Sequence, residues 1–247
     1  MWSLYTTLLA PSLYATAAPP SPADLQAQLI AAIATDATTF TIPPAVYNFT
    51  DRSFNISGAT ALHIIATGAT VLFGGTAGVN MSNCADVHVS GLAIDYYRPP
   101  HGRLGVPGIT YNLLNCSRVL SEDVTIFKAP FFSVTAFNGG GGHIFRRFNL
   151  PNDTAVGPSG RPSDPYPHQR DAFHFTDLRA GVVLEDSVAS GFGDDFFNSH
   201  NTIMLVLERV SSTTLLVINP HLQNVRKPAG CKSTDHTPEC IISNKNT

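Results

Sequence analysis

Three aspartates in the C-terminal half of the chain have the residue type and spacing for acid–base chemistry. Asp194 and Asp195 follow Asp171 by 23 and 24 residues, in a chain of which 13% is charged. This spacing is close to one turn of a β-solenoid, in which residues one coil apart stack about 4.8 Å apart. We therefore expect the three carboxyl groups to share one small patch. One carboxyl of a crowded group keeps its proton near neutral pH, and glycoside hydrolysis uses such a protonated acid beside an ionised one.

Short β-branched runs broken by Gly, Asn and Asp follow residue 40, and they are the elements that must position these acids. Three of the runs resemble one another and begin at Cys84, Cys116 and Leu178, 32 and 62 residues apart. Self-similarity at this scale indicates stacked units that share one core. The sequence predicts an all-β fold, a right-handed parallel β-helix over residues 19–223 that is itself incomplete. A β-sandwich or jelly roll is the alternative.

Residues 22–35 are predicted to form a helix that covers the N-terminal end of this solenoid. Ser21 can cap the helix, and Pro22 suits its first turn. The apolar stripe consists of Leu25, Leu29, Ile30 and Ile33. Terminal repeats need such a cap because their edges and core are otherwise exposed.

Two proline-rich stretches, residues 96–107 and 151–168, interrupt the strand pattern and are predicted to be long loops. Long loops in compact domains are often functional or disordered. The second leads directly into Asp171, which makes it a candidate wall of a substrate site.

The sequence around the acids resembles the parallel β-helix glycoside hydrolases of the pectin lyase-like superfamily. The resemblance lies in Asp171-Ala-Phe-His174, Gly193-Asp-Asp195 and Asn198-Ser-His200. It is strongest to the inverting α-1,3-galactosidases of glycoside hydrolase family 110, and more distant to the polygalacturonases. It is specific over residues 170–200 and a matter of general pattern over residues 40–169. It implies a hydrolase that removes terminal α-linked galactose, or a similar sugar, by inversion without metal or organic cofactor.

The resemblance also implies roles for individual residues. Asp194 or Asp195 would be the general base that activates water, and the other acids, including Asp171, would protonate the departing oxygen or hold the water. Which aspartate is the acid stays open. Contacts with the sugar or with the acids are implied for five further residues: His174, Asn198, His200, Arg170 and Arg179.

Other functions stay open at this point. A pectin-type polygalacturonase is a rival with the same fold, although the chain shows no rich basic groove for uronates. A carbohydrate-binding β-helix without turnover is a rival of another class, in which truncation has left a relic of the site. An Asp-Asp pair also suits an ordinary solenoid turn.

Composition bounds the partners of the chain. Its 247 residues suit one domain, and a net charge of −3 with a pI near 6.3 gives no reason to expect nucleic acid or a membrane as partner. A carbohydrate is the expected partner, and the oligomeric state is left open.

Several features indicate secretion. Residues 1–18 are predicted to be a signal peptide, because a short apolar run ends in the small-residue site Ala15-Thr16-Ala17. Glycosylation sequons occur at five positions: Asn48, Asn55, Asn80, Asn115 and Asn152. We expect an extracellular glycoprotein.

The four cysteines fit an oxidising compartment and do not have zinc-site spacing. Residues 224–247 are predicted to be an irregular tail in which Cys231 and Cys240 form a disulfide. Cys84 and Cys116 occupy equivalent repeat positions and are expected to stack in the core.

Overall fold

A computed structural model describes most of the chain. The described ranges are 18–50, 52–75, 77–98, 108–151, 157–160, 167–201, 205–209, 214–218, 231–234 and 237–243. The predicted signal peptide, apart from Ala18, lies outside these ranges, as does the sequon at Asn152.

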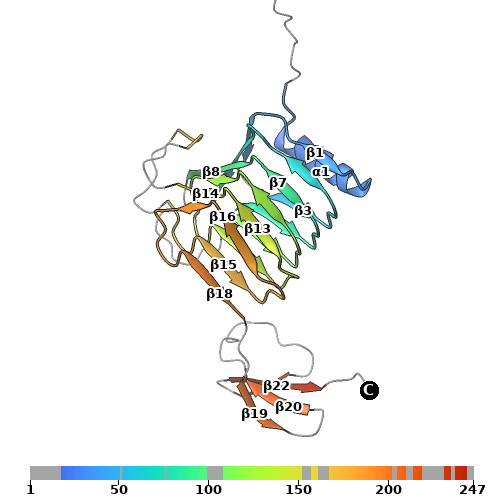
Figure 1. The fold of residues 1–247 in the computed structure, drawn as a ribbon, viewed down its shortest axis with the longest axis vertical. Helices are drawn as coiled ribbons and strands as arrows, with labels where there is room; N and C mark the ends of the chain where they lie inside the picture. Colours follow the sequence, from blue (N-terminus) through green and yellow to red (C-terminus); the bar gives the residue numbers. More distant parts are fainter. Residues whose placement is uncertain are drawn as a thin grey trace, which may run out of the picture.

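Successive strands wind into a right-handed parallel β-helix, in which each coil adds one strand to each of three six-stranded sheets (Figure 1). Sheet A contains β1 (Thr39–Thr41), β4 (His63–Ile65), β7 (His88–Ser90), β10 (Leu120–Glu122), β13 (His143–Arg146) and β16 (Val182–Glu185). Sheet B contains β2 (Val46–Phe49), β5 (Thr70–Gly74), β8 (Ala93–Arg98), β11 (Thr125–Ile126), β14 (Asn149–Leu150) and β17 (Val188–Ala189). Sheet C contains β3 (Phe54–Ser57), β6 (Val79–Ser82), β9 (Tyr111–Leu114), β12 (Val134–Phe137), β15 (Phe173–Thr176) and β18 (Phe197–His200). The predicted fold class is confirmed, and the sandwich alternative is wrong.

The coils differ in length, which explains why the sequence repeat is weak. One column of sheet A runs through Thr39, His63, His88, Leu120, Ile144 and Val183. The spacings along it are therefore 24, 25, 32, 24 and 39 residues. The two long coils contain the proline-rich stretches, each between a strand of sheet B and a strand of sheet C in the chain. We call this position the B–C corner. The predicted loop 96–107 starts too early, because residues 96–98 belong to β8.

The first two repeat segments stack as predicted, and the third is shifted by one residue. Ala85 pairs with Ser117, so Cys84 lies in register with Cys116, and both thiols are buried and free. Aligning the segments that begin at Cys116 and Leu178 places Gly181 in the column of Val119. In the structure Val182 occupies that column, because it pairs with His143.

Alternate residues of many strands, such as β3, β6 and β15, point inward and form one continuous core, whereas β5 is buried at four successive positions. In β15, Phe173 and Phe175 are buried while the residues between and after them are half-buried. Their rings contact Phe145, which lies 5.7 Å from each between ring centroids. Burying one such side chain stabilises the fold by roughly 1.5–3 kcal/mol.

Tight corners explain the Asn and Asp residues that punctuate the sequence. The residue after a strand of sheet C has a positive φ of 54° at Asn83, 55° at Asn115, 52° at Asn138 and 57° at Asp177. Asn and Asp tolerate this left-handed conformation better than other non-glycine residues, because their short side chains bond locally. The chain can therefore turn in one residue at this corner.

The predicted N-terminal helix is confirmed as α1 (Pro22–Ala34), with Ser21 as its cap. Leu25 and Leu29 are buried as expected, whereas Ile30 is 58% exposed, so its assignment to the apolar stripe was wrong. The Gln26 side chain accepts from the Asn55 backbone N–H and donates to its carbonyl, both at 2.8 Å. The helix thus satisfies part of the open edge of sheet C.

The described residues after 204 form a separate antiparallel sheet. Its strands are β19 (Leu205–Arg209), β20 (Thr214–Ile218), β21 (Cys231–Thr234) and β22 (Thr237–Ser243). The last β-helix strand ends at His200, well before the predicted boundary at 223, and β21 and β22 fall in the tail that was expected to be irregular. Cys231 is the register partner of Cys240 across β21 and β22. The side chains of Cys231 and Cys240 lie outside the described structure, so the disulfide stays a prediction.

Across the described ranges, α1 is the sole helix, and no helix there has the length and apolar character needed to span a bilayer.

Candidate active site

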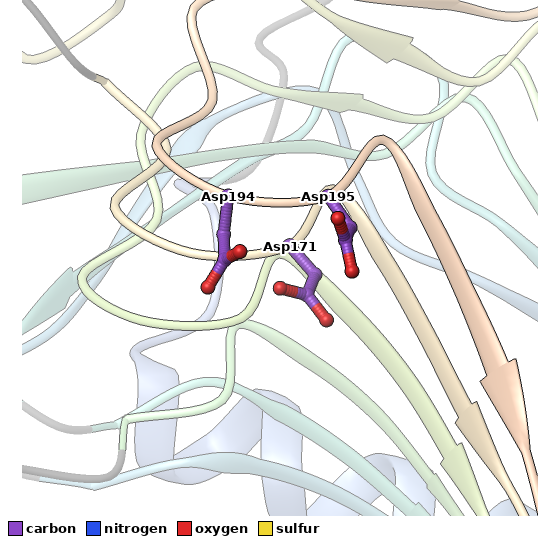
Figure 2. Close-up of side chains that lie close together, drawn as sticks. All are labelled: Asp171, Asp194 and Asp195. Carbon is purple, nitrogen blue, oxygen red and sulfur yellow. The ribbon is translucent and has the colours of Figure 1, made fainter.

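The three aspartates lie at the B–C corner of two neighbouring coils. Asp171 precedes β15, and Asp194 and Asp195 precede β18, which pairs with β15 in a 24-residue register. Ala172 donates its backbone N–H to the Asp195 carbonyl at 2.9 Å, which fixes the two coils at this point. The side chains point to the same side (Figure 2), and one carboxylate oxygen from each lies within 4.8 Å of the others. The spacing in the sequence therefore led to the correct juxtaposition.

The three acids have different surroundings. Asp171 is 3% exposed, whereas the Asp194 side chain is 44% exposed and Asp195 is also exposed. His174 Nδ1 and Asp171 Oδ2 are hydrogen-bonded at 2.6 Å, which fixes the orientation of that carboxyl group. The buried acid is thus oriented by the protein, and the two exposed acids face solvent.

Arg170 is the charged partner of the exposed side of the cluster. Its Nη1 lies 3.2 Å from Asp194 Oδ2, and its guanidinium carbon lies 5.5 Å from the centroid of the Phe131 ring. A guanidinium over an aromatic face gains from the ring quadrupole. This contact holds the cation beside the acids.

Two other residues implied by the resemblance also reach the cluster. Asn198 donates from Nδ2 to Asp195 Oδ2 at 3.3 Å. The His200 ring lies edge-on to His174 at 5.3 Å, and its Nε2 is 3.4 Å from Thr176 Oγ1. His200 therefore contacts the ring of His174, which in turn is hydrogen-bonded to Asp171.

Arg179 is not brought to the acids. It is exposed and follows the C-terminal end of β15, whereas the aspartates precede the N-terminal ends of β15 and β18. A contact with the sugar stays a prediction for this residue, but a role in neutralising the acid cluster does not fit its position.

Sequence reasoning missed two aromatic residues at the site, Phe131 and Phe132. Both are half-buried on the neighbouring coil, and the Phe132 ring lies 4.5 Å from the His174 ring at an interplanar angle of 32°. The coil that separates them from His174 includes the long stretch 151–168, so no regular spacing connects these residues in the sequence. The signal in the sequence was the Phe131-Phe132 pair itself, which lies between two strands rather than within one.

His168 stabilises the B–C corner through hydrogen bonds to neighbouring residues. It is fully buried, its Nδ1 is 3.1 Å from Ser133 Oγ, and its Nε2 is 3.3 Å from the Pro151 carbonyl oxygen. Burial lowers the pKa of His168 to about 4, so it is neutral at neutral pH. Its carbonyl accepts from the Gly193 N–H at 2.8 Å, which ties the coil of Asp171 to the coil of Asp194.

The cluster also has the donor set of a cation site. Within the described ranges, Asp171, Asp194 and Asp195 are the one group whose ligand atoms converge enough to hold a metal ion. Carboxylate oxygens suit hard cations such as Ca²⁺ and Mg²⁺, although exposed acid groups commonly occur without one.

The fold and the site together define a parallel β-helix protein with an acid cluster on one corner. Comparison with known proteins adds one partial similarity: 55 residues are 42% identical to alpha-1,3-galactosidase B of Akkermansia muciniphila. The matched stretch covers 22% of this chain and 7% of the galactosidase. No protein-family model matches the chain.

Proposed function

We propose that the chain is a secreted glycoside hydrolase that removes terminal α-linked galactose, or a similar sugar, by acid–base chemistry at the aspartate cluster. The observation that carries the proposal is the convergence of the carboxylates of Asp171, Asp194 and Asp195 within 4.8 Å. Like charges stacked on neighbouring coils cost stability, so their presence favours a chemical role. The partial similarity to a galactosidase supports a sugar as substrate.

The chemistry requires one protonated and one ionised carboxyl. The protonated acid gives its proton to the glycosidic oxygen while the bond from that oxygen to the anomeric carbon breaks. Water attacks the anomeric carbon from the opposite face and loses its proton to the ionised carboxylate. Asp171, oriented by His174, and the exposed pair Asp194 and Asp195 supply these roles in the proposal.

The proposal also covers the stereochemical course of hydrolysis, which either inverts or retains the anomeric configuration. Inversion is the course that the galactosidase resemblance implies. Acid and base of inverting enzymes usually lie about 6.5–9.5 Å apart, whereas retaining pairs lie about 5 Å apart. In this cluster one carboxylate oxygen from each aspartate lies within 4.8 Å of the others, which is a closest approach between oxygens and does not by itself select either course.

The residues around the acids fit a sugar. Phe131 and Phe132 are half-buried aromatic rings, which suit the apolar face of a pyranose. His174, Asn198 and Arg170 offer hydrogen bonds to hydroxyl groups beside the acids. Secretion is supported by the sequons at Asn48, Asn55 and Asn115, which are exposed on the described surface.

Release of sugar from defined glycosides tests the function. The purified chain is expected to hydrolyse an aryl α-galactoside faster than polygalacturonate, and the single changes Asp171→Asn, Asp194→Asn and Asp195→Asn are each expected to lower turnover. Asp186→Asn is the matched control, because Asp186 is an exposed corner aspartate outside the cluster. Activity that survives EDTA separates acid–base chemistry from a metal-dependent reaction.

Proton NMR of the first product anomer decides the course: β-galactose from an α-galactoside supports inversion, and α-galactose assigns retention. Preference for polygalacturonate would assign the rival pectin-type activity. A folded chain that hydrolyses none of these substrates would overturn the hydrolase proposal.

A further inference from the structure

A fully buried ion pair lies in the two coils next to the site. Asp95 of β8 is 0% exposed and Lys128, which follows β11, is 1% exposed. Lys128 Nζ lies 3.6 Å from Asp95 Oδ1. A buried ion pair carries a desolvation cost that only good geometry and further hydrogen bonds offset. The groups that are hydrogen-bonded to Asp95 and Lys128 therefore indicate what the pair stabilises.

Both members of the pair bind one segment of the long stretch 151–168. The Ser159 backbone N–H donates to Asp95 Oδ2 at 2.9 Å, and Lys128 Nζ donates to Ser159 Oγ at 3.0 Å. The other carboxylate oxygen of Asp95 accepts from the Tyr96 N–H at 2.7 Å. The two charges therefore hold residues 157–160 against the coils of β8 and β11.

The close approach depends on glycine at position 157. A Cβ there would lie 2.4 Å from Asp95 Oδ2 and 3.0 Å from Phe127 Cβ. Gly160, three residues on, has a φ of +68° but no atom within 4 Å of its own Cβ position. A methyl group at 157 would displace the segment from the pair, whereas a side chain at 160 projects into open space.

The pair is connected to the candidate site through one corner. Lys128 starts the turn between β11 and β12 that carries Phe131 and Phe132. The Ala129 N–H donates to the Pro167 carbonyl at 2.8 Å, and the Arg170 N–H donates to the Phe131 carbonyl at 3.2 Å. These bonds align the turn with residues 167–170, which lead directly into Asp171.

We propose that Asp95 and Lys128 are positioning residues, which fasten residues 157–160 and the Phe131 and Phe132 turn in the arrangement that a glycan needs at the acid cluster. They touch no reacting atom, so they set the affinity for an oligosaccharide and not the proton transfers. This inference rests on the proposed function for its kinetic part and on the hydrogen bonds above for its structural part.

The test compares Gly157→Ala with Gly160→Asn, two changes in the same segment. Lys128→Met is less suitable because loss of one buried charge can prevent folding. Hydrogen exchange measured at the Ser159 amide is expected to accelerate at least tenfold in Gly157→Ala and to stay within about twofold in Gly160→Asn, because Asn tolerates a positive φ. For a galacto-oligosaccharide, Gly157→Ala should raise KM about tenfold with kcat within about twofold, since small displacements of substrate-positioning groups have effects of this size.

The possible outcomes are separable. Faster exchange together with the rise in KM supports the inference. Unchanged exchange overturns the fastening by Asp95 and Lys128, and faster exchange with unchanged KM overturns its role in binding. If the wild-type chain has no hydrolase activity, the proposed function fails; the KM is then replaced by the Kd of the same oligosaccharide, and an unchanged Kd overturns the inference.

Discussion

Two kinds of corner in this β-helix stack charged residues on neighbouring coils, and they do so with opposite charge patterns. At the corners beside sheet A, Arg118 lies over Asp86 and Arg147 over Asp123, with nitrogen–oxygen distances of 2.6 and 2.7 Å. At the B–C corner, three aspartates converge within 4.8 Å. The same coil register thus produces an ion-pair ladder in one place and a like-charge cluster in another.

The difference separates residues that stabilise the fold from residues that have another role. The Arg118 guanidinium holds the pKa of Asp86 below its usual range, and Arg147 does the same for Asp123. These carboxylates therefore stabilise the folded state above the pKa of the unfolded chain, and the contribution is lost as the pH falls through the lowered pKa. Among the residues that the structure describes, one guanidinium, that of Arg170, pairs with the cluster of three carboxyl groups. A cluster that folding does not favour is the better candidate for chemistry.

The largest effect is expected at the buried opposite-charge pair Asp95–Lys128, which lies next to the B–C corner. Lys128→Met leaves Asp95 buried without its cation and should lower the free energy of unfolding by about 3–5 kcal/mol. Replacing both, as Asp95→Leu with Lys128→Met, should cost clearly less, because no uncompensated charge stays buried. Urea denaturation of the three proteins measures this. Equal losses in the single and double variants would show that packing and not charge accounts for the effect.

Much of this fold could be read from the sequence because its corners recur. Most of the positive-φ corner positions hold Asn, Asp or Gly, with Ala61, Arg118 and Arg147 as exceptions, and many strands alternate buried and exposed residues. The acid cluster was predictable because Asp171 and Asp195 lie one coil apart without an intervening loop.

Other parts could not be read because their partners are separated by irregular stretches. Phe132 meets His174 across a coil that includes residues 151–168, and Asp95 meets Ser159 from two coils away. The resemblance implied a site role for Arg179, but the whole of strand β15 separates this residue from Asp171. The antiparallel sheet after residue 204 follows a different hydrogen-bonding pattern from the repeat that precedes it.

A second prediction compares a buried histidine of sheet A with the buried histidine of the B–C corner. Burial lowers the pKa of His143 in sheet A and of His168 at the B–C corner to about 4. The unfolded state, with a pKa near 6.5, then binds more protons between pH 6.5 and pH 4, so stability falls as the pH falls through this window. Each histidine should contribute a loss of roughly 3 kcal/mol by pH 4. Urea midpoints should change little between pH 8 and pH 7.

Single His→Gln variants show how much each buried histidine contributes to the pH dependence of stability. His143→Gln and His168→Gln should each flatten the pH dependence of stability by a similar amount, since both rings are fully buried. If His168→Gln leaves the slope unchanged, the B–C corner opens to water around this histidine, and the fastening of the Asp171 and Asp194 coils by His168 is wrong.

A third prediction separates stability from activity at the cluster itself. Asp171→Asn should lower turnover at least about 10²-fold, equivalent to about 2.7 kcal/mol of transition-state stabilisation. The melting temperature should hold or rise, because Asn is nearly isosteric and one like charge is removed. Asp186→Asn should leave both turnover and melting temperature near wild type. A fall in the melting temperature of Asp171→Asn that matches its loss of turnover would make Asp171 a structural residue.

The smallest expected effect concerns the assumption that stacked aspartates lower stability. It is tested by placing two aspartates on adjacent coils at a corner that now has an ion pair. Arg118 and Asp86 both have positive φ, 50° and 55°, and their side chains are largely exposed. Arg118→Asp places two aspartates on adjacent coils, as at the candidate site, while Arg118→Asn removes the ion pair without adding a like charge. Both replacements tolerate the left-handed backbone, so they differ only in charge. The melting temperature of Arg118→Asp should be lower than that of Arg118→Asn by less than about 2 °C at low ionic strength, and the difference should vanish in 1 M salt, where exposed charges are screened. If the two variants melt together at low salt, stacked aspartates cost nothing at an exposed corner, and the convergence of Asp194 and Asp195 with Asp171 loses its force as an argument for function.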